Sequence, residues 1–228
     1  MTSHDPTVLP PGLPVPADDG AADHLPVPAD DGAADHLPGQ ALPALALPST
    51  AGEPIDLAAA ATGTLVLFCY PRTGRPGEAP PPGWDEIPGA RGCTPQACGF
   101  RDHHAELAGL GARLLGLSAQ PLEEQLETAG RLGLPYPLLS DPDLLLAEAL
   151  RLPTFEAAGM RLYRRPKKLA HDQDHGIPEG DHGGRRGHAR ASLTLVARAG
   201  RVAHVFYPVF PPDRNAAEVA AWLRRHPA

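Results

Sequence analysis

The apolar run Thr64–Tyr70 (TLVLFCY) constrains the fold of this chain more than any other segment. Its side chains are partly β-branched and do not alternate between polar and apolar, which is typical of a strand buried on both faces. The run is much shorter than the roughly 18 to 20 residues that a membrane-spanning helix needs. Other elements must therefore cover this strand on both sides.

Helical and strand patterns alternate after this run, as in a parallel sheet with right-handed crossovers. Two short strands around the turn at 49–52 precede it. The elements expected after it are helices at 94–111, 121–132 and 142–150, strands at 112–118 and 135–141, a hairpin at 192–209 turning at 198–200, and a last helix capped by Asp213. The predicted fold class is α/β. We expect a thioredoxin-like mixed sheet with helices on both faces, a closing β-hairpin and a C-terminal helix.

The N-terminal part of the chain has a different composition. Residues 13–36 are a tandem duplication of LPVPADDGAADH, which holds too few apolar side chains to offset the entropy of ordering the chain. We therefore expect a disordered acidic leader over 1–40 and one folded domain over 41–228. A partner-binding arm is the alternative for the duplicated segment.

Two segments inside the domain also depart from the alternating pattern. One is a Pro-rich loop over 71–92, in which Trp84 would either line the mouth of a site or cover an apolar patch. The other is a His-rich insertion over 166–189, which we expect to be disordered. A transition-metal site formed by its four histidines is the alternative.

Charge and cysteine content exclude several classes of protein. The formal net charge of −7 argues against a general nucleic-acid binder, which needs a basic surface. Three cysteines are too few for a disulfide-stapled secreted scaffold, and the N-terminus lacks the basic start and apolar region of a signal peptide. We expect a cytoplasmic protein without membrane contact, in which nearby cysteines are catalytic or metal-binding.

Cys93 and Cys98 form the motif GCTPQAC, which lies where the Pro-rich loop meets a predicted helix. Free N–H groups and the dipole of a helix favour negative charge at its N-terminus. We therefore expect the Cys93 thiol to ionise more easily than usual and to act as a nucleophile. Arg91 and Arg101 flank the motif and add positive charge.

The spacing of these two cysteines has a further consequence. Residues five apart in an intact helix have Cα atoms roughly 8–9 Å apart, whereas a disulfide tolerates about 7 Å at most. Cys93 and Cys98 would pair only after the helix start unwinds, and Gly92 and Gly99 lie where they would ease that motion. Two inert thiols, or half of a zinc site that needs two further ligands, are the alternatives. Cys69, inside the apolar run, is expected to be a buried core thiol.

The stretch LVLFCYPR…GARGCTPQACGFRD resembles the peroxiredoxins, specifically their Q or bacterioferritin-comigratory branch. Weaker likenesses extend over about 42–226 and include PYPLLSDPDLLLAEAL and LTLVARAGRV. The resemblance implies a thioredoxin fold and a thiol peroxidase for hydrogen peroxide or organic hydroperoxides. It implies that Cys93 is the peroxidatic and Cys98 the resolving cysteine. A thioredoxin-like dithiol would be the reductant, with no cofactor or metal, in a monomer or weak dimer.

The chain departs from the family motif at two supporting positions. The family carries a threonine three residues before the reactive cysteine, where this chain has Ala90. We favour Thr73 as its replacement over Thr94, which would instead cap the helix. The family also carries an arginine just before the first hairpin strand; Arg190 lies closest to that position, and Arg165 is its competitor.

Two other functions remain open from the sequence. The first is a thiol redox sensor whose disulfide changes the binding of a partner, and the absence of threonine at position 90 favours it. The second is a disulfide oxidoreductase, although the usual C-x-x-C spacing is missing. Repeated turnover of peroxide with thioredoxin would distinguish the peroxidase from both.

Overall fold

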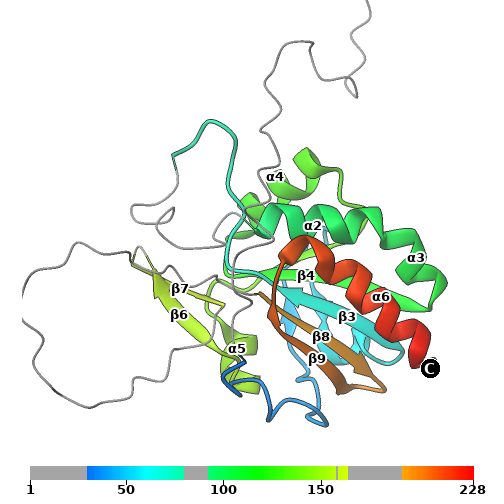
Figure 1. The fold of residues 1–228 in the computed structure, drawn as a ribbon. Coiled ribbons are helices and arrows are strands. Elements are labelled where there is room, and N and C mark those ends of the chain that lie inside the picture. Colours follow the sequence, from blue (N-terminus) through cyan, green and yellow to red (C-terminus); the bar gives the residue numbers. More distant parts are fainter. Residues whose placement is uncertain (1–29, 80–91, 158, 164–191) are drawn as a thin grey trace, which may run out of the picture.

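A mixed five-stranded sheet forms the centre of the computed structural model, which describes residues 30–79, 92–157, 159–163 and 192–228. The strand order is β5 (Leu138–Ser140), β4 (Ala112–Ser118), β3 (Thr64–Cys69), β8 (Ser192–Arg198) and β9 (Arg201–Val209). Strands β3, β4 and β5 run parallel, whereas β8 is antiparallel to both β3 and β9 (Figure 1). The expected antiparallel hairpin at one edge of a parallel sheet is confirmed.

Strand β3 lies in the middle of this sheet and is buried along its whole length. Successive side chains of a strand point to opposite faces, and two separate core clusters result. Leu65 and Leu67 belong to one cluster, and Val66 and Phe68 belong to the other. The prediction of a strand buried on both faces is therefore confirmed.

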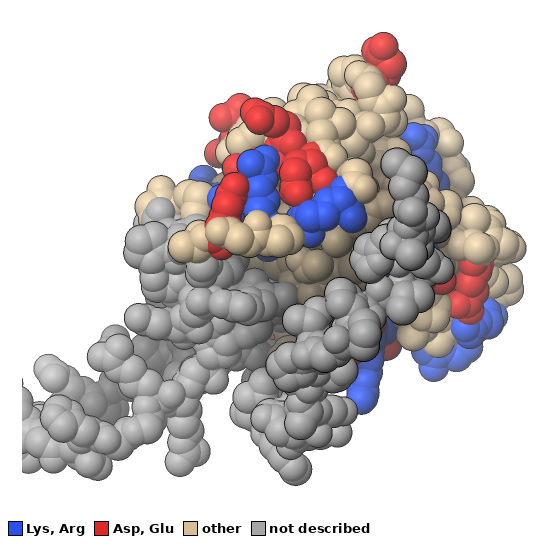
Figure 2. Space-filling view, turned by 90° about the horizontal axis from the view of Figure 1, so that it is seen from above, with Lys and Arg blue, Asp and Glu red and all other residues tan. Residues whose placement is uncertain are grey.

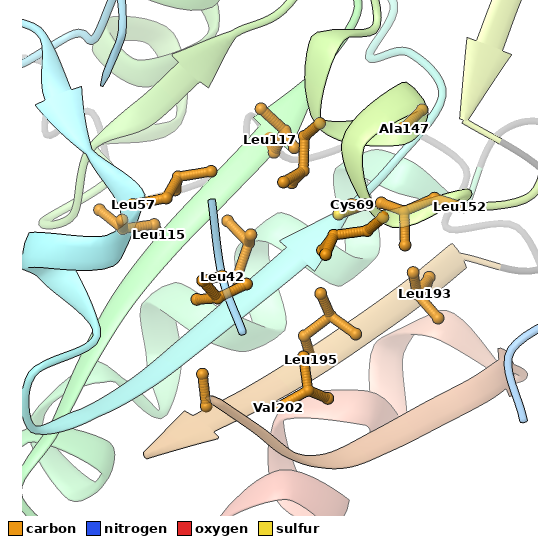
Figure 3. Packing of buried hydrophobic residues seen from close by; sticks show 14 of the residues in the cluster. Leu42, Leu57, Cys69, Leu115, Leu117, Ala147, Leu152, Leu193, Leu195 and Val202 are labelled. Carbon is orange, nitrogen blue, oxygen red and sulfur yellow. The ribbon is translucent and has the colours of Figure 1, made fainter. Parts of the chain in front are cut away.

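Helices cover both faces of the sheet. The cluster around Phe68 is covered by α2 (Cys93–Asp102), α3 (His104–Gly109), α4 (Leu122–Leu132) and α6 (Asn215–Arg225). The opposite cluster is covered by α1 (Leu57–Ala60) and α5 (Leu145–Leu150), as the close view of its packed leucines shows (Figure 3). The α/β thioredoxin-like fold class is confirmed.

Several local expectations differ from the structure. The predicted helix at 94–111 is two helices, α2 and α3, which meet at His103. Asp213 does not cap the last helix, because it lies in a 3₁₀ turn, η2 (Pro212–Arg214), directly before α6. A hairpin of β6 (Thr154–Ala157) and β7 (Met160–Tyr163) was not predicted, whereas the expected pair β1 (Ala46–Leu47) and β2 (Ile55–Asp56) is present.

The expected boundary between leader and domain at residue 40 is wrong. Ala34 and Leu37 are buried in the core, at 5% and 0% exposure. The backbone N–H of Gly39 donates to the Val202 carbonyl at 2.8 Å, which ties this segment to β9. Ala34 lies in the second copy of the duplicated sequence and Leu37 lies directly after it, and both cover a face of the sheet although the segment is poor in apolar residues. Order therefore begins no later than residue 30.

We predict that Leu37→Ala lowers the free energy of unfolding by about 2 to 4 kcal/mol, because it removes a fully buried side chain and leaves a cavity. Urea denaturation of the full chain measures this change. Leu126→Ala is the matched control, since Leu126 is 49% exposed and should lose far less. Equal stabilities of the Leu37 variant and the parent would contradict docking of the 30–40 segment.

Candidate active site

Cys93 is the first residue of α2 and is 3% exposed, although it lies at a helix N-terminus. The helix is preceded by Gly92, and no side chain caps it. Backbone N–H groups of Arg72 and of Cys93 itself act as hydrogen-bond donors toward the sulfur. The thiol is thus surrounded by backbone donors and by the apolar cluster that includes Tyr70 and Phe100.

Burial dominates the ionisation of this thiol. It raises the pKa of Cys93 to about 11, while the N–H groups of Arg72 and Cys93 act in the opposite direction and less strongly. Among the described residues, burial thus outweighs the helix start and the backbone donors, while the expected contribution of Arg91 lies outside the described residues. Loss of hydration disfavours the charged form of a buried thiol more than the backbone donors favour it.

Thr73 directly follows Arg72 in the sequence and lies in a buried polar cluster. Its backbone N–H and its hydroxyl both donate to Gln120 Oε1, at 2.8 and 3.1 Å, and the hydroxyl lies 2.9 Å from Thr128 Oγ1. The hydroxyl of Thr73 is thus hydrogen-bonded to α4 and to the loop before it. A role of Thr73 toward peroxide stays a prediction, as does the capping role of Thr94, which lies in the first turn of α2.

A patch of ion pairs fixes the same segment on α4. Arg72 lies 3.2 Å from Glu124, and Arg75 lies 3.8 Å from Glu127, which also pairs with Arg131 at 2.6 Å. Acidic and basic side chains interleave on this side of the molecule (Figure 2). Each pair is partly exposed and adds little stability alone. Together they hold the chain after β3 where its backbone meets Cys93.

Cys98 lies in the same uninterrupted helix as Cys93, is half-buried, and is a free thiol like the other two cysteines. The two sulfurs therefore cannot form a bond while α2 is intact. Cys69 lies in the core cluster on the other side of the sheet, among Leu117, Ala147 and Leu193 (Figure 3). Burial raises the pKa of Cys69, in line with the expected core thiol.

Close packing sets the position of α2 against the sheet. The Phe100 ring stacks on Phe68 with centroids 4.5 Å apart, and Phe68 fills the space over Gly116. Gly99 also lies tight against a neighbour, since a Cβ there would be 3.0 Å from the Asp213 carbonyl oxygen. The structure thus gives Gly99 a packing role, where the sequence suggested a hinge.

The sequence reasoning missed two buried amides that join α2 to the start of α6. Gln96 and Asn215 are both at 0% exposure; Gln96 Nε2 donates to Asn215 Oδ1 at 3.1 Å, and Thr194 Oγ1 donates to the same oxygen at 2.7 Å. These residues come from α2, α6 and β8, which are far apart in sequence. A polar side chain inside the CTPQAC helix was the one available signal.

Other candidates lie outside the described residues: Arg190, Arg165, Arg91, Ala90, Trp84, and the histidines of the 166–189 insertion. Within the described ranges, no cluster of three or more histidine, cysteine, aspartate or glutamate side chains is arranged to hold a metal ion. Nor does any helix in the described part of the chain have the length and apolar character needed to cross a membrane.

Comparison with known proteins agrees with this fold and site. The Redoxin family model matches residues 37–177, more than half of the chain. The chain therefore belongs to the redoxin family. Its curated relatives place it in the peroxiredoxin Q/Bcp branch.

These curated relatives are matched over part of their length. The chain is 30% identical to peroxiredoxin bcp1 of Schizosaccharomyces pombe over 141 residues, 60% of each chain. It is 35% identical to the chloroplastic peroxiredoxin Q of Arabidopsis thaliana over 103 residues, 45% of this chain and 41% of the relative. The chain thus spans less than two thirds of either relative.

Solved structures share the fold. Peroxidoxin BcpB of Mycobacterium tuberculosis aligns with a TM-score of 0.59 at 24% identity, over 84% of this chain and 99% of that one. The bacterioferritin comigratory protein of Xanthomonas campestris, whose structures were described in relation to alkyl peroxide reduction, aligns with a TM-score of 0.56 at 23% identity, over 83% of this chain and 100% of that one.

We predict that Gly116→Ala destabilises the protein by about 1 to 3 kcal/mol, because the added Cβ would overpack the layer that seats α2. That atom would lie 2.6 Å from Leu138 Cδ2 and 2.8 Å from Phe68 Cζ. Thermal and urea unfolding measure the loss. Gly130→Ala in α4 is the control: nothing lies within 4 Å of its Cβ, and alanine favours a helix. A stable Gly116 variant would contradict the tight Phe68 contact.

Proposed function

We propose that this protein is a thiol peroxidase that reduces hydrogen peroxide or organic hydroperoxides with Cys93 as the nucleophile. The observation that carries the proposal is the position of Cys93. It begins α2 among backbone N–H donors, and a second free cysteine, Cys98, lies in the same helix. Membership of the peroxiredoxin Q/Bcp branch supports the same chemistry.

The reaction follows from sulfur chemistry. The Cys93 thiolate attacks one peroxide oxygen, the O–O bond breaks, and the other oxygen takes a proton and leaves as water or an alcohol. Cys93 is left as a sulfenic acid. The Cys98 thiol attacks this sulfur, so that a disulfide forms and a water molecule leaves. A dithiol then reduces the disulfide by exchange and becomes a disulfide itself.

Ionisation of Cys93 at neutral pH needs more than the described surroundings supply. A thiol with a pKa of about 11 is almost entirely protonated at pH 7, and the thiolate is the reactive form. A positive charge near the sulfur favours the charged form and offsets the effect of burial. We assign this charge to Arg190, with Arg165 as the competitor.

Substrate and partner follow from the same proposal. An alkyl hydroperoxide as substrate is supported by the Xanthomonas campestris relative, whose structures were described in relation to alkyl peroxide reduction. The reductant is a thioredoxin-like protein, since the product is a protein disulfide that a dithiol can exchange. We place the protein in the cytoplasm as a monomer or weak dimer, with no role for nucleic acid or membrane.

We predict that Cys93→Ser abolishes consumption of peroxide, because a serine hydroxyl does not ionise at neutral pH as a thiol can. The assay follows steady-state loss of peroxide with thioredoxin, its reductase and their nucleotide reductant. Cys69→Ser is the matched control and should retain turnover, since Cys69 lies on the other side of the sheet. Wild-type activity in the Cys93 variant would end the assignment.

A redox sensor is the alternative function, and the similarity to peroxiredoxins does not favour it. The same steady-state assay separates the two functions. A peroxidase turns over many equivalents of peroxide with thioredoxin, whereas a sensor reacts once and then stops.

We predict that Arg190→Gln raises the pKa of Cys93 toward about 11 and slows its reaction with peroxide at pH 7 by at least about tenfold. Each unit by which the pKa rises above the ambient pH lowers the thiolate fraction about tenfold. The pH dependence of alkylation by iodoacetamide, measured on Cys93, reports the pKa. Arg165→Gln is the paired variant: a larger shift there than in the Arg190 variant would move the assignment to Arg165.

A further inference from the structure

Within the described part of the chain, two side-chain hydrogen bonds connect the residues between Cys93 and Cys98 to distant elements. Tyr136 Oη donates to the Ala97 carbonyl oxygen at 2.7 Å, from the segment between α4 and β5. Gln96 Nε2 donates to Asn215 Oδ1 at 3.1 Å, at the start of α6. All the side chains involved are buried, with Tyr136 at 4% exposure and both amides at 0%.

Both bonds act on the stretch that must unwind before the two sulfurs can meet. A disulfide between Cys93 and Cys98 is impossible in the intact helix, so residues 94–97 have to leave their helical positions. That movement displaces the Ala97 carbonyl and the Gln96 side chain from their partners. The two contacts therefore oppose unwinding directly.

We propose that Tyr136 and the Gln96–Asn215 pair form a latch that sets how fast Cys98 reaches oxidised Cys93. The proposal rests on the peroxidase function above and adds its positioning residues. The latch holds α2 closed while peroxide reacts, and its strength fixes how long the sulfenic acid waits for Cys98.

The hydrogen bonding of the two amides in the closed latch is incomplete. Gln96 Oε1 and Asn215 Nδ2 are buried and have no hydrogen-bond partner among the described residues. An unpaired buried polar group raises the free energy of the closed state, and these two groups regain partners in water when the helix opens. The amide pair thus holds α2 weakly, and the Tyr136 bond is the stronger tie.

The other end of α2 is anchored differently. Phe100 is fully buried and stacks on Phe68, two residues beyond Cys98. This apolar contact does not involve the residues between the cysteines. Opening therefore stays confined to the start of the helix, and the remainder of α2 keeps its place on the sheet.

The latch governs a competition between two reactions of the sulfenic acid. Attack by the Cys98 thiol forms the disulfide and releases water. A second peroxide molecule instead adds an oxygen, which yields the sulfinic acid and water or an alcohol. Faster opening of α2 favours the disulfide and protects Cys93 from over-oxidation.

Tyr136→Phe tests the latch with a minimal change. The Tyr136 ring packs edge-on against Phe68 with centroids 5.8 Å apart, and phenylalanine keeps that contact while losing the hydroxyl. Loss of one hydrogen bond of ordinary strength should speed opening and disulfide formation roughly three- to tenfold. The peroxide concentration that converts half of Cys93 to sulfinic acid should rise by a similar factor.

Tyr163→Phe is the matched control. The Tyr163 hydroxyl is also buried and donates to Asp141, but it lies in the core cluster on the opposite side of the sheet. This variant removes the same atom without touching α2, so disulfide formation and over-oxidation should match wild type. Asn215→Ala cuts the second tie and should shift both readouts in the same direction as Tyr136→Phe.

Three measurements are made on each variant in the reduced full-length chain. Amide exchange over residues 94–98 reports opening of α2 without any oxidant. Disulfide formation is followed after one equivalent of peroxide, and separately with diamide, which takes two electrons and two protons from the two thiols. Mass spectrometry of Cys93 then gives the fraction over-oxidised at rising peroxide concentration.

These measurements distinguish failure of the latch proposal from failure of the proposed function. If wild type does not consume peroxide, the peroxidase proposal fails, while amide exchange and diamide oxidation still test the latch. The latch is overturned if Tyr136→Phe and Asn215→Ala match wild type and Tyr163→Phe in exchange over 94–98 and in disulfide formation.

Discussion

The stacking of Phe100 on Phe68 is the contact on which the arrangement of the site depends. Phe68 comes from the central strand, and its ring has room only because Gly116 on the neighbouring strand has no side chain. Phe100 packs α2 against the Phe68 ring. This contact brings the start of the helix, with Cys93, against the end of β3. Because β3 is buried on both faces, it holds Phe68 firmly in place. The Cys93 sulfur therefore meets backbone N–H groups in a fixed geometry.

The same packing creates a conflict at Cys93. Burial shields the Cys93 thiol from water, but it also raises the pKa of that thiol. The backbone donors around the sulfur are too weak to reverse that effect. The proposed chemistry at neutral pH would need a further positive charge near the sulfur, and in the proposed latch opening of the helix is set by Tyr136 and the two buried amides.

Much of the fold could be predicted from local pattern. The run Thr64–Tyr70 is uniformly apolar because it lies in the centre of the sheet, and strand β4 matches the predicted 112–118. The departures arise where distant elements decide the outcome. Leu126 fits an apolar helix face but is 49% exposed, while Gln125 is buried because it hydrogen-bonds to Tyr70 and to the Leu139 carbonyl. Leu37 belongs to a leader-like sequence, yet a nearby face of the core accepts it.

The sequence by itself determined the class of fold, the cysteine pair and the need to unwind a helix before that pair can bond, because these follow from periodicity and spacing along one segment. Only the tertiary structure decided that Cys93 is buried with a raised pKa, that Cys69 lies beyond the sheet, and that Gln96, Tyr136 and Asn215 meet around α2. These properties depend on which elements pack together. Desolvation and hydrogen bonding between segments more than a hundred residues apart, as for Gln96 and Asn215, leave no periodic signal in the chain.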